Sequence, residues 1–433
     1  MRGVTYPKVV ITSVNHLRSV LQECNTKRTT VLLRGCEYSS VDHFCSNQNG
    51  IVLDLGIFKA VTLKDGIVTA GGGNTWTEIL EKIVPQGYYI ESKQSGNTFT
   101  VGGSISSNVH GRSIRNPQLR DILISITIML ANGDVKTIRP GDVLFDYVVG
   151  GFGLFGVIIR ARIKAGKDFA AEMVIKEYDS VDEITRILRN RSSNLIKFYA
   201  CPHFTRIING SGKGFMVKLY YKTSNSKVAG KCRPLNKIYV PRLLPPKLFK
   251  RILNPMSDDY MFKKNCDKII SNTEFKCISE SDETFSFKNT YFNLGRHIEF
   301  FIPLQYYELF LRNFISIFPY NIYNRGTRYM YSQSSTKLNY VKPNRKYLSL
   351  VIGFKMYDKD YRSNVWKKFM TDVIELLLLY DTRFHLCYKF AMFVPNHILY
   401  KIFPSMPEFI HMKQRHDPNN IFRTRFYDKI SVS

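Results

Sequence analysis

Apolar and polar positions alternate in short blocks over the first 165 residues, a pattern that predicts strands separated by helices. Strands are expected at 9–11, 30–33, 51–55, 122–130, 135–138 and 157–163. Ser13 is placed to cap one amphipathic helix, and Thr75 and Glu78 form a capping box that begins another. The dipeptides Asp-Gly at 65–66 and Asn-Gly at 132–133 each predict a tight hairpin. Because no GxGxxG follows the first strand, the pattern predicts an α+β domain and excludes a Rossmann unit.

A different pattern begins near Lys167, where the predicted elements are sparser. Helices are expected at 182–189, 364–380 and 407–427 (ending at 417–420), and strands at 215–221, 297–302, 347–354 and 384–390. The segment 231–268 is rich in basic residues and proline. Within it, 245–253 predicts a short helix with one basic and one apolar face. Such a helix either lies on an anionic membrane surface or packs on its own domain.

Length and charge limit the class of protein. The chain has 433 residues, of which 44% are hydrophobic, enough for two or three domains with full cores. Basic residues outnumber acidic ones by 62 to 35, a formal net charge of +27. This charge favours anionic partners such as nucleic acid, an acidic membrane or a phosphorylated substrate. It is equally consistent with a general compositional bias, and no specific nucleic-acid motif accompanies it.

Cysteine usage and the N-terminus indicate a cellular setting. The eight cysteines form no CxxC pair and no metal-ligand spacing, so we expect thiols in a reducing compartment and no metal site. The first residues lack the apolar region of a signal peptide, and no apolar run is long enough to span a bilayer. The expected location is cytoplasmic, with peripheral attachment to a membrane as an open alternative.

One stretch, QSGNTFTVGGSISSNVHG (94–111), is dominated by glycine and small polar residues. Its composition predicts irregular structure with several positive-φ positions. Gly102 and Gly103, flanked by Thr100 and Ser104, would present backbone N–H groups and hydroxyls to a ligand. Such a concave set of donors suits a pyrophosphate or the polar edge of a flavin ring. An ordinary surface loop of the same composition is the alternative.

The order of residues in four segments resembles one enzyme family. The segments are LLRGCEYSSVD, TVGGSISSNVHG, LFDYVVGGFGLFGVIIRARI and RHDPNNIF. They resemble FAD-dependent oxidoreductases of the vanillyl-alcohol oxidase / p-cresol methylhydroxylase (PCMH) type, and within it the decaprenylphosphoryl-ribose oxidase and sugar-lactone oxidase branch. The resemblance implies a two-part PCMH-type FAD-binding domain (1–165, completed by 401–433) and an α+β cap, or substrate, domain (166–400).

The resemblance also implies which residues hold FAD. They are Arg34, Gly35, Cys36, Glu37, Tyr38 and Ser39; Gly96, Asn97, Thr98, Thr100, Gly102, Gly103, Ser104, Ser107, Asn108, His110 and Gly111; and Gly153, Gly156, Val157 and Ile158. Glu37 departs from the family pattern, which has a glycine there. Tyr38 stands where the family members with covalent flavin have histidine, so non-covalent FAD is expected.

Four residues are candidates for catalysis by the same resemblance. His110 either contacts the flavin or is an ordinary core histidine. His297 and Glu299 share one face of a predicted strand, at positions that line the substrate pocket in the family. Lys389, on the strand predicted at 384–390, either neutralises charge on the reduced flavin or is a solvated surface lysine.

The function implied is oxidation of a hydroxyl-bearing carbon of a sugar or sugar-like alcohol, by hydride transfer to flavin N5. The implied partner is a small sugar-like substrate, with or without peripheral contact to an anionic membrane or a polyprenyl-phosphate lipid. A catalytically degenerate flavoprotein fold kept for binding is the alternative, favoured by Glu37 and by Ser40, which replaces a family tyrosine. A nucleic-acid-binding protein rests on net charge alone.

Overall fold

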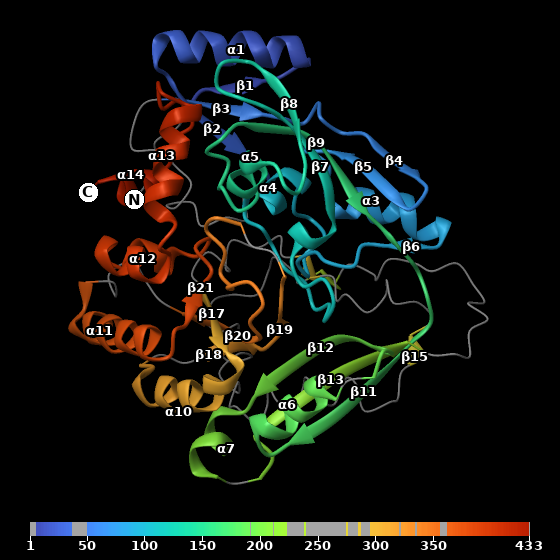
Figure 1. Ribbon diagram of the computed structural model, residues 1–433, viewed down its shortest axis with the longest axis vertical. Helices are drawn as coiled ribbons and strands as arrows, with labels where there is room; N and C mark the ends of the chain where they lie inside the picture. The colour runs from blue at the N-terminus through green and yellow to red at the C-terminus, as the bar shows by residue number, and fades with distance from the viewer. Residues whose placement is uncertain are drawn as a thin grey trace.

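The computed structural model describes residues 6–36, 50–190, 192–210, 212–222, 238–239, 274–275, 285–286, 295–319, 322–333, 336–355 and 362–432. Glu37, Tyr38 and Ser39 therefore lie outside the described residues, as does the basic helix predicted at 245–253. Figure 1 shows two layered halves, with the N-terminal sheets above and the cap sheets below.

The N-terminal domain begins with a small parallel sheet ordered β1-β3-β2. Its elements are β1 (Lys8–Val10), α1 (Val14–Lys27), β2 (Thr30–Arg34) and β3 (Gly50–Asp54). Ser13 caps α1 by accepting a hydrogen bond from the backbone N–H of His16, as predicted. Leu17 and Leu21 of α1 are fully buried with Leu53 of β3, so the apolar face of the helix covers this sheet.

A five-stranded antiparallel sheet, ordered β4-β5-β9-β7-β8, forms the rest of this domain. Its elements are β4 (Val61–Lys64), β5 (Ile67–Gly71), α3 (Trp76–Ile83), η1 (Val84–Gln86), η2 (Leu119–Ile122), β7 (Leu123–Met129), β8 (Val135–Ile138), α5 (Val143–Val148) and β9 (Val157–Lys164). Both predicted hairpins are confirmed, β4–β5 and β7–β8. The capping box of Thr75 and Glu78 at the start of α3 is confirmed as well.

The glycine-rich stretch is more regular than its composition predicts. Residues Val101–Ser106 form a short helix, α4, capped by the hydroxyl of Thr100. Gly102 and Gly103 lie inside this helix, and neither has a positive φ. The prediction of irregular structure was therefore wrong here. What Gly102 supplies is close approach: a Cβ on it would lie 3.0 Å from the carbonyl oxygen of Gly72.

The cap contains two antiparallel sheets. One is ordered β12-β13-β11-β15 and the other β18-β20-β17-β21, with β19 also paired to β20. The elements are β11 (Ala171–Tyr178), α6 (Val181–Arg189), β12 (Leu195–Pro202), α7 (Phe204–Asn209), β13 (Phe215–Lys222), β15 (Glu274–Phe275), β17 (Gly295–Pro303), η5 (Leu304–Tyr306), α10 (Tyr307–Ile317), β18 (Ile322–Gly326), β19 (Tyr329–Met330), β20 (Tyr347–Lys355), α11 (Asn364–Leu379) and β21 (Arg383–Phe384). Short pairs β6 (Tyr88–Tyr89) with β10 (Gly166–Lys167) and β14 (Ile238–Tyr239) with β16 (Phe285–Ser286) complete the sheets. The fold class is α+β, as predicted.

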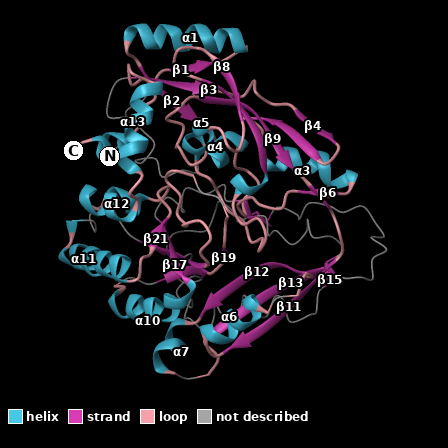
Figure 2. Ribbon diagram, in the orientation of Figure 1, coloured by secondary structure: helices cyan, strands magenta, loops and turns pink. Residues whose placement is uncertain are grey.

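The chain ends in helices grouped along one side of the molecule (Figure 2), namely η7 (Lys389–Met392), α12 (Asn396–Ile402), α13 (Met406–His416) and α14 (Arg425–Ser431). The strand predicted at 384–390 was wrong, because pairing with β17 stops after Phe384 and the chain turns. The residues after Phe384 are mostly aromatic or otherwise apolar, and a short apolar run of this kind is also typical of a buried strand.

The C-terminal segment returns to the N-terminal domain. The N–H of Val31 in β2 donates to the carbonyl of Ile421 at 2.7 Å, and Phe422 is buried in the same core as α1. Asp417 holds this segment in shape: its carboxylate accepts the Nζ of Lys413 at 2.8 Å and the backbone N–H of Ile421 at 3.0 Å. The domain boundaries at 165 and 400 stay predictions, although this contact agrees with a two-part first domain.

Candidate active site

Strand β17 brings two predicted residues to the centre of the molecule. His297 and Glu299 are two positions apart and so share a face, which is the geometry the sequence predicted. Glu299 is 2% exposed. A buried carboxylate is costly unless it is paired, so its partners decide what the site can do.

The first partner of Glu299 comes from the glycine-rich stretch. His110 Nε2 lies 3.0 Å from Glu299 Oε1, and both side chains are buried. The two residues are almost 190 positions apart in the sequence, so this contact joins the N-terminal domain to the cap. The sequence named both residues but gave no reason for them to touch.

A second cation faces the same carboxylate, since Arg328 Nη1 lies 3.5 Å from Glu299 Oε1. The backbone of Glu299 is fixed separately, because its main-chain carbonyl accepts the backbone N–H of His385 at 2.9 Å. Burial raises the pKa of Glu299, but the opposing charges of His110 and Arg328 outweigh it and hold that pKa at about 2. Glu299 is therefore ionised at neutral pH.

The neighbouring histidines are neutral. Burial lowers the pKa of His297 to about 4 and that of His385 to about 3, against the charge of Glu299, which raises both. The Nδ1 of His385 accepts the backbone N–H of Cys387 at 3.4 Å, which leaves its proton on Nε2. The site thus holds an anionic carboxylate beside imidazoles that can accept a proton.

Aromatic rings enclose this cluster. Tyr340 stacks on Phe301 with ring centroids 4.3 Å apart and lies 4.6 Å from the ring of His385. The hydroxyl of Tyr340 donates to the backbone carbonyl of Asn108 at 2.9 Å, a second link between the cap and the glycine-rich stretch. These rings exclude water and so strengthen the electrostatic interactions of Glu299.

The end of β2 and the start of α4 form a second feature, which we call the cradle and which consists of the backbone at Gly35 and Gly103. A Cβ on Gly35 would meet only the side chain of Thr100, at 2.8 Å from its hydroxyl oxygen, and one on Gly103 would meet only that same oxygen, at 3.0 Å. Gly35 and Gly103 are both exposed. Exposed backbone without a side chain of its own fits a flat or phosphorylated cofactor, so these positions suit the flavin nucleotide implied by the sequence.

Several other predicted cofactor residues bond within the protein. Asn97 accepts the Nζ of Lys93 at 2.6 Å, and the Ser104 hydroxyl accepts the indole N–H of Trp76 at 2.9 Å. The amide of Asn108 donates to Gln118 at 2.7 Å. Each of these side chains therefore hydrogen-bonds another protein side chain and helps to hold the glycine-rich stretch in place. Gly96, Thr98, Ser107 and Gly111 lie in the same stretch, between and around these residues.

The third predicted segment is built around glycines that the backbone requires. Gly153 has φ of 75° and Gly156 has φ of 144°, a region that L side chains rarely adopt. A Cβ on Gly156 would lie 2.3 Å from the carbonyl oxygen of Met129. Val157 and Ile158 follow as buried residues of β9. This segment therefore fixes the path of the chain beside α4.

Lys389 and Arg34 are more exposed than the buried pair. Lys389 is half-buried in η7, directly after Tyr388, whose ring lies 6.3 Å from that of His297. Arg34 and Cys36 are exposed on either side of Gly35. The four cysteines that the structure describes, Cys24, Cys36, Cys201 and Cys387, are all thiols.

Sequence reasoning missed three residues of the cluster: Arg328, Tyr340 and His385. His385 carried a usable signal, because a histidine within the apolar run FHLCYKF breaks the pattern of a buried strand. Arg328 and Tyr340 carried none, since arginine and tyrosine are frequent throughout this chain.

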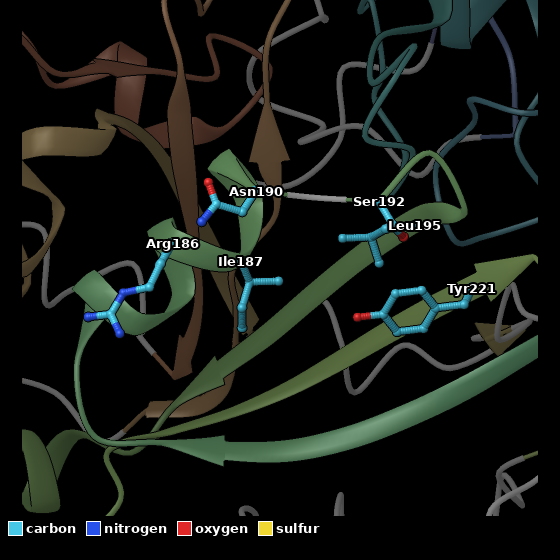
Figure 3. A pocket seen from close by; sticks show the side chains of 6 residues that line it. All are labelled: Arg186, Ile187, Asn190, Ser192, Leu195 and Tyr221. Carbon is cyan, nitrogen blue, oxygen red and sulfur yellow. The ribbon is translucent and has the colours of Figure 1, made fainter.

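A hollow on the cap is separate from this cluster. It is lined by Arg186 and Ile187 of α6, Leu195 of β12, Tyr221 of β13, and Asn190 and Ser192 between α6 and β12. Figure 3 shows Arg186, Ile187 and Asn190 on one side and Ser192, Leu195 and Tyr221 on the other. None of the residues proposed for catalysis lines it. Among the described residues, no group of histidine, cysteine and carboxylate side chains could hold a metal ion, and no helix is long and apolar enough to cross a bilayer.

Comparison with known families identifies the N-terminal part of the chain. Residues 8–139 match the family described as "FAD binding domain". Residues 8–139 are a PCMH-type FAD-binding domain. The cofactor is FAD. The matched range covers the small parallel sheet, the glycine cradle and His110, which are the parts that the sequence assigned to cofactor binding.

Curated relatives match about a third of the chain. Cytokinin dehydrogenase 2 of Oryza sativa is 32% identical over 147 residues, which cover 31% of this chain and 26% of that protein. Decaprenylphosphoryl-beta-D-ribose oxidase of Mycolicibacterium smegmatis is 26% identical over 165 residues, covering 36% and 34%. The matched region thus spans about a quarter to a third of the length of these relatives.

The fold likeness extends over the cap as well. Cholesterol oxidase from B. sterolicum superimposes with a TM-score of 0.73 and covers 98% of this chain and 93% of its own, at 12% sequence identity. At that identity the likeness concerns the fold alone. The likeness in fold therefore includes the residues that match the FAD binding domain and also the cap sheets.

Proposed function

We propose that this protein is an FAD-dependent oxidoreductase whose active site lies at the contact between His110 and Glu299. The observation that carries the proposal is the 3.0 Å distance between these buried groups, one from the FAD-binding domain and one from the cap. Glu299 is buried and its pKa is lowered to about 2 by the charges that face it, and perturbed pKa values of this kind cluster at functional sites.

The reaction is oxidation of an alcohol to a carbonyl compound. FAD supplies the acceptor for the hydride that leaves the C–H bond. The hydroxyl proton must leave at the same time, and His297 accepts it at Nδ1 or Nε2, because burial keeps this imidazole neutral at pH 7. Glu299, ionised beside it, stabilises the positive charge that His297 gains. His110 and Arg328 hold that carboxylate in place.

A sugar or sugar-like alcohol is the proposed substrate. Support comes from decaprenylphosphoryl-beta-D-ribose oxidase among the relatives, whereas the cytokinin dehydrogenases are named for a different substrate. We also propose that FAD is held without a covalent bond, since Tyr38 stands where family members with covalent flavin have histidine. A cytoplasmic location, with or without contact to an anionic membrane or polyprenyl-phosphate lipid, stays a prediction.

The test is anaerobic reduction of the bound flavin by a panel of sugars, sugar lactols and sugar phosphates. We expect at least one to bleach the flavin absorbance of the wild-type protein and to do so far more slowly with Glu299→Gln. A matched control is Glu177→Gln, which changes an exposed glutamate on strand β11. Flavin that no alcohol reduces, in a protein that chemical reductants do reduce, would favour the degenerate binding protein instead.

A further inference from the structure

The glycine-rich stretch turns at a residue that is not glycine. Residues 94–111 are all described, and among them only Asn108 has a positive φ, of 43°. This left-handed conformation is unfavourable for a residue with a Cβ, although asparagine tolerates it better than most. Asn108 is 2% exposed, so water does not hold its backbone in place. The surrounding protein must therefore maintain the turn.

Two sets of contacts hold Asn108, one from each part of the molecule. From the N-terminal domain, its amide Nδ2 donates to Gln118 Oε1 at 2.7 Å, and its Oδ1 accepts the backbone N–H of Arg120 at 3.3 Å. From the cap, the hydroxyl of Tyr340 donates to its backbone carbonyl at 2.9 Å. The cap thus stabilises a turn that belongs to the FAD-binding domain.

The turn at Asn108 sets the position of His110. One residue separates the two, and two steps of chain span at most about 7 Å. A modest rotation at Asn108 is therefore enough to break the 3.0 Å contact between His110 Nε2 and Glu299 Oε1. The segment itself holds the imidazole weakly, since His110 Nδ1 lies 3.5 Å from the carbonyl oxygen of Gly111, a long contact.

Tyr340 is fixed within the cap. It is 2% exposed, and its ring stacks on that of Phe301 and lies 5.6 Å from that of His110. The carbonyl of the preceding residue, Asn339, accepts Nη1 of Arg383 at 2.7 Å. The phenol hydroxyl is therefore held in a defined position.

Ring packing alone does not account for the hydroxyl of Tyr340. Phenylalanine would fill the same space beside Phe301, and a buried hydroxyl is unfavourable unless it is hydrogen-bonded. Burial and the charge of Glu299 raise the pKa of Tyr340 well above its ordinary value, so the phenol keeps its proton and remains a donor. What the hydroxyl adds is the hydrogen bond to Asn108.

We propose that Tyr340 is a positioning residue of the active site: by holding the carbonyl of Asn108, it keeps the imidazole of His110 against Glu299. This inference rests on the proposed function, because it concerns the alignment of the pair to which that function is assigned. Tyr340 acts through His110, and its role requires no contact with substrate or flavin.

The first experiment measures this alignment in the full-length protein as purified, with its histidines labelled with carbon-13. Glu299→Gln turns the carboxylate beside His110 into a neutral amide and should shift the nuclear magnetic resonance signal of that imidazole. Loss of the signal in His110→Gln identifies it. In the Tyr340→Phe background the shift should be at most about half as large, because the influence of a charge falls with distance.

Tyr340→Phe keeps the stacked ring, so circular dichroism should show a folded protein. A shift of wild-type size in this folded variant would overturn the proposal.

Tyr400→Phe is the matched control. The Tyr400 hydroxyl also donates to a backbone carbonyl, that of Ile430 at 2.6 Å, but this bond joins α12 to α14. The control should leave the shift caused by Glu299→Gln at its wild-type size. A reduction equal to that in Tyr340→Phe would show that loss of any such bond loosens the site, and the specific role of Tyr340 would be wrong.

The second experiment is a double-mutant cycle on flavin reduction, with whichever alcohol of the sugar panel reduces the flavin at saturating concentration. Tyr340→Phe should retain FAD and slow reduction roughly 10-fold, the effect of losing one neutral hydrogen bond. In the His110→Gln background it should cause no further slowing, because two residues that act through one contact are not additive. Equal slowing in both backgrounds would contradict a role through His110.

The two experiments separate this inference from the proposed function. If no alcohol reduces the flavin, the proposed function fails. The histidine spectra need no substrate, so they still decide whether Tyr340 positions His110 against Glu299.

Discussion

The two sides of the proposed active site differ in the groups that they present to a ligand. The FAD-binding side, at Gly35 and Gly103, presents bare backbone, where an added Cβ would meet only the side chain of Thr100. The cap side presents buried ionisable groups, Glu299 and His385 among them, whose pKa values burial and charge displace. The first side should therefore be sensitive to shape and the second to charge.

This difference predicts separable effects. A change of volume on the cradle side should remove the cofactor and leave the protein folded, since Gly35 and Gly103 are exposed and an added Cβ would crowd the Thr100 side chain. A change of charge on the cap side should leave the cofactor bound and alter the reaction, the stability or the pH dependence. Substitutions on each side test whether cofactor binding and reactivity are separable in this way.

Gly103→Val should reduce flavin occupancy to background. Gly103 lies within α4, where valine is at least as compatible with helical backbone as glycine, so the fold should persist. Extra side-chain volume in a packed protein interior costs about 1–3 kcal/mol when the neighbouring groups can move. A rigid flavin nucleotide cannot move in this way, so the added valine should prevent it from binding. Flavin content by absorbance and folding by circular dichroism are the measurements. Gly103→Ala should retain more flavin than the valine variant, and full occupancy in a folded valine variant would show that this stretch is not the cradle.

Glu299→Gln should slow flavin reduction by substrate about 100- to 1000-fold, the usual effect of removing one preorganised charge. FAD should remain bound, because Glu299 belongs to the cap. Stopped-flow absorbance measures the rate, and Glu177→Gln is the control at an exposed site. A Glu299→Gln protein that loses its flavin would break the division between the two sides.

His385→Gln should flatten the dependence of stability on pH. Burial lowers the pKa of His385 to about 3, whereas the unfolded chain protonates near 6.5. The unfolded state therefore binds more protons below pH 6.5, and wild-type stability falls as the pH decreases from about 6.5 toward 3. Each unit of pH in that window costs up to about 1.4 kcal/mol per histidine. Denaturant melts at pH 7.5 and 5 measure the slope, and a slope equal to that of wild type would place His385 in contact with solvent.

Lys389→Met should have the smallest effect, a lower flavin midpoint potential with FAD still bound. Its ammonium is half-buried in η7, so solvent screens part of its influence on a reduced, anionic flavin. We expect about a tenfold slower reduction by substrate, which corresponds to roughly 1.4 kcal/mol. Dye-coupled reductive titration measures the potential. An unchanged potential at full occupancy would make Lys389 a surface residue.

The same division governs what the sequence could predict. Local signals such as the capping box of Thr75 and Glu78 or the Asn-Gly hairpin at 132–133 depend on neighbours in the chain, and they were correct. The helix at 101–106 was missed because glycine is a poor helix former by itself, while the cap by Thr100 and the close approach to Gly72 stabilise it here.

The active-site residues show the same limit, namely that sequence signals report neighbours in the chain and not contacts between distant segments. His297 and Glu299 were placed on one face by strand periodicity, which needs only their spacing. The contact of Glu299 with His110, and the presence of Arg328 and His385 around it, come from segments far apart in the chain. Composition and periodicity contain no information on such tertiary pairs, so only the structure could bring them together.

The visible absorbance spectrum of the purified protein, before and after precipitation with trichloroacetic acid, tests the central claim most directly. A non-covalent FAD oxidoreductase predicts oxidised-flavin bands in the native protein and free FAD in the acid supernatant. A yellow pellet with flavin attached would contradict the non-covalent link. Colourless protein that cannot be reconstituted with FAD would contradict the account as a whole.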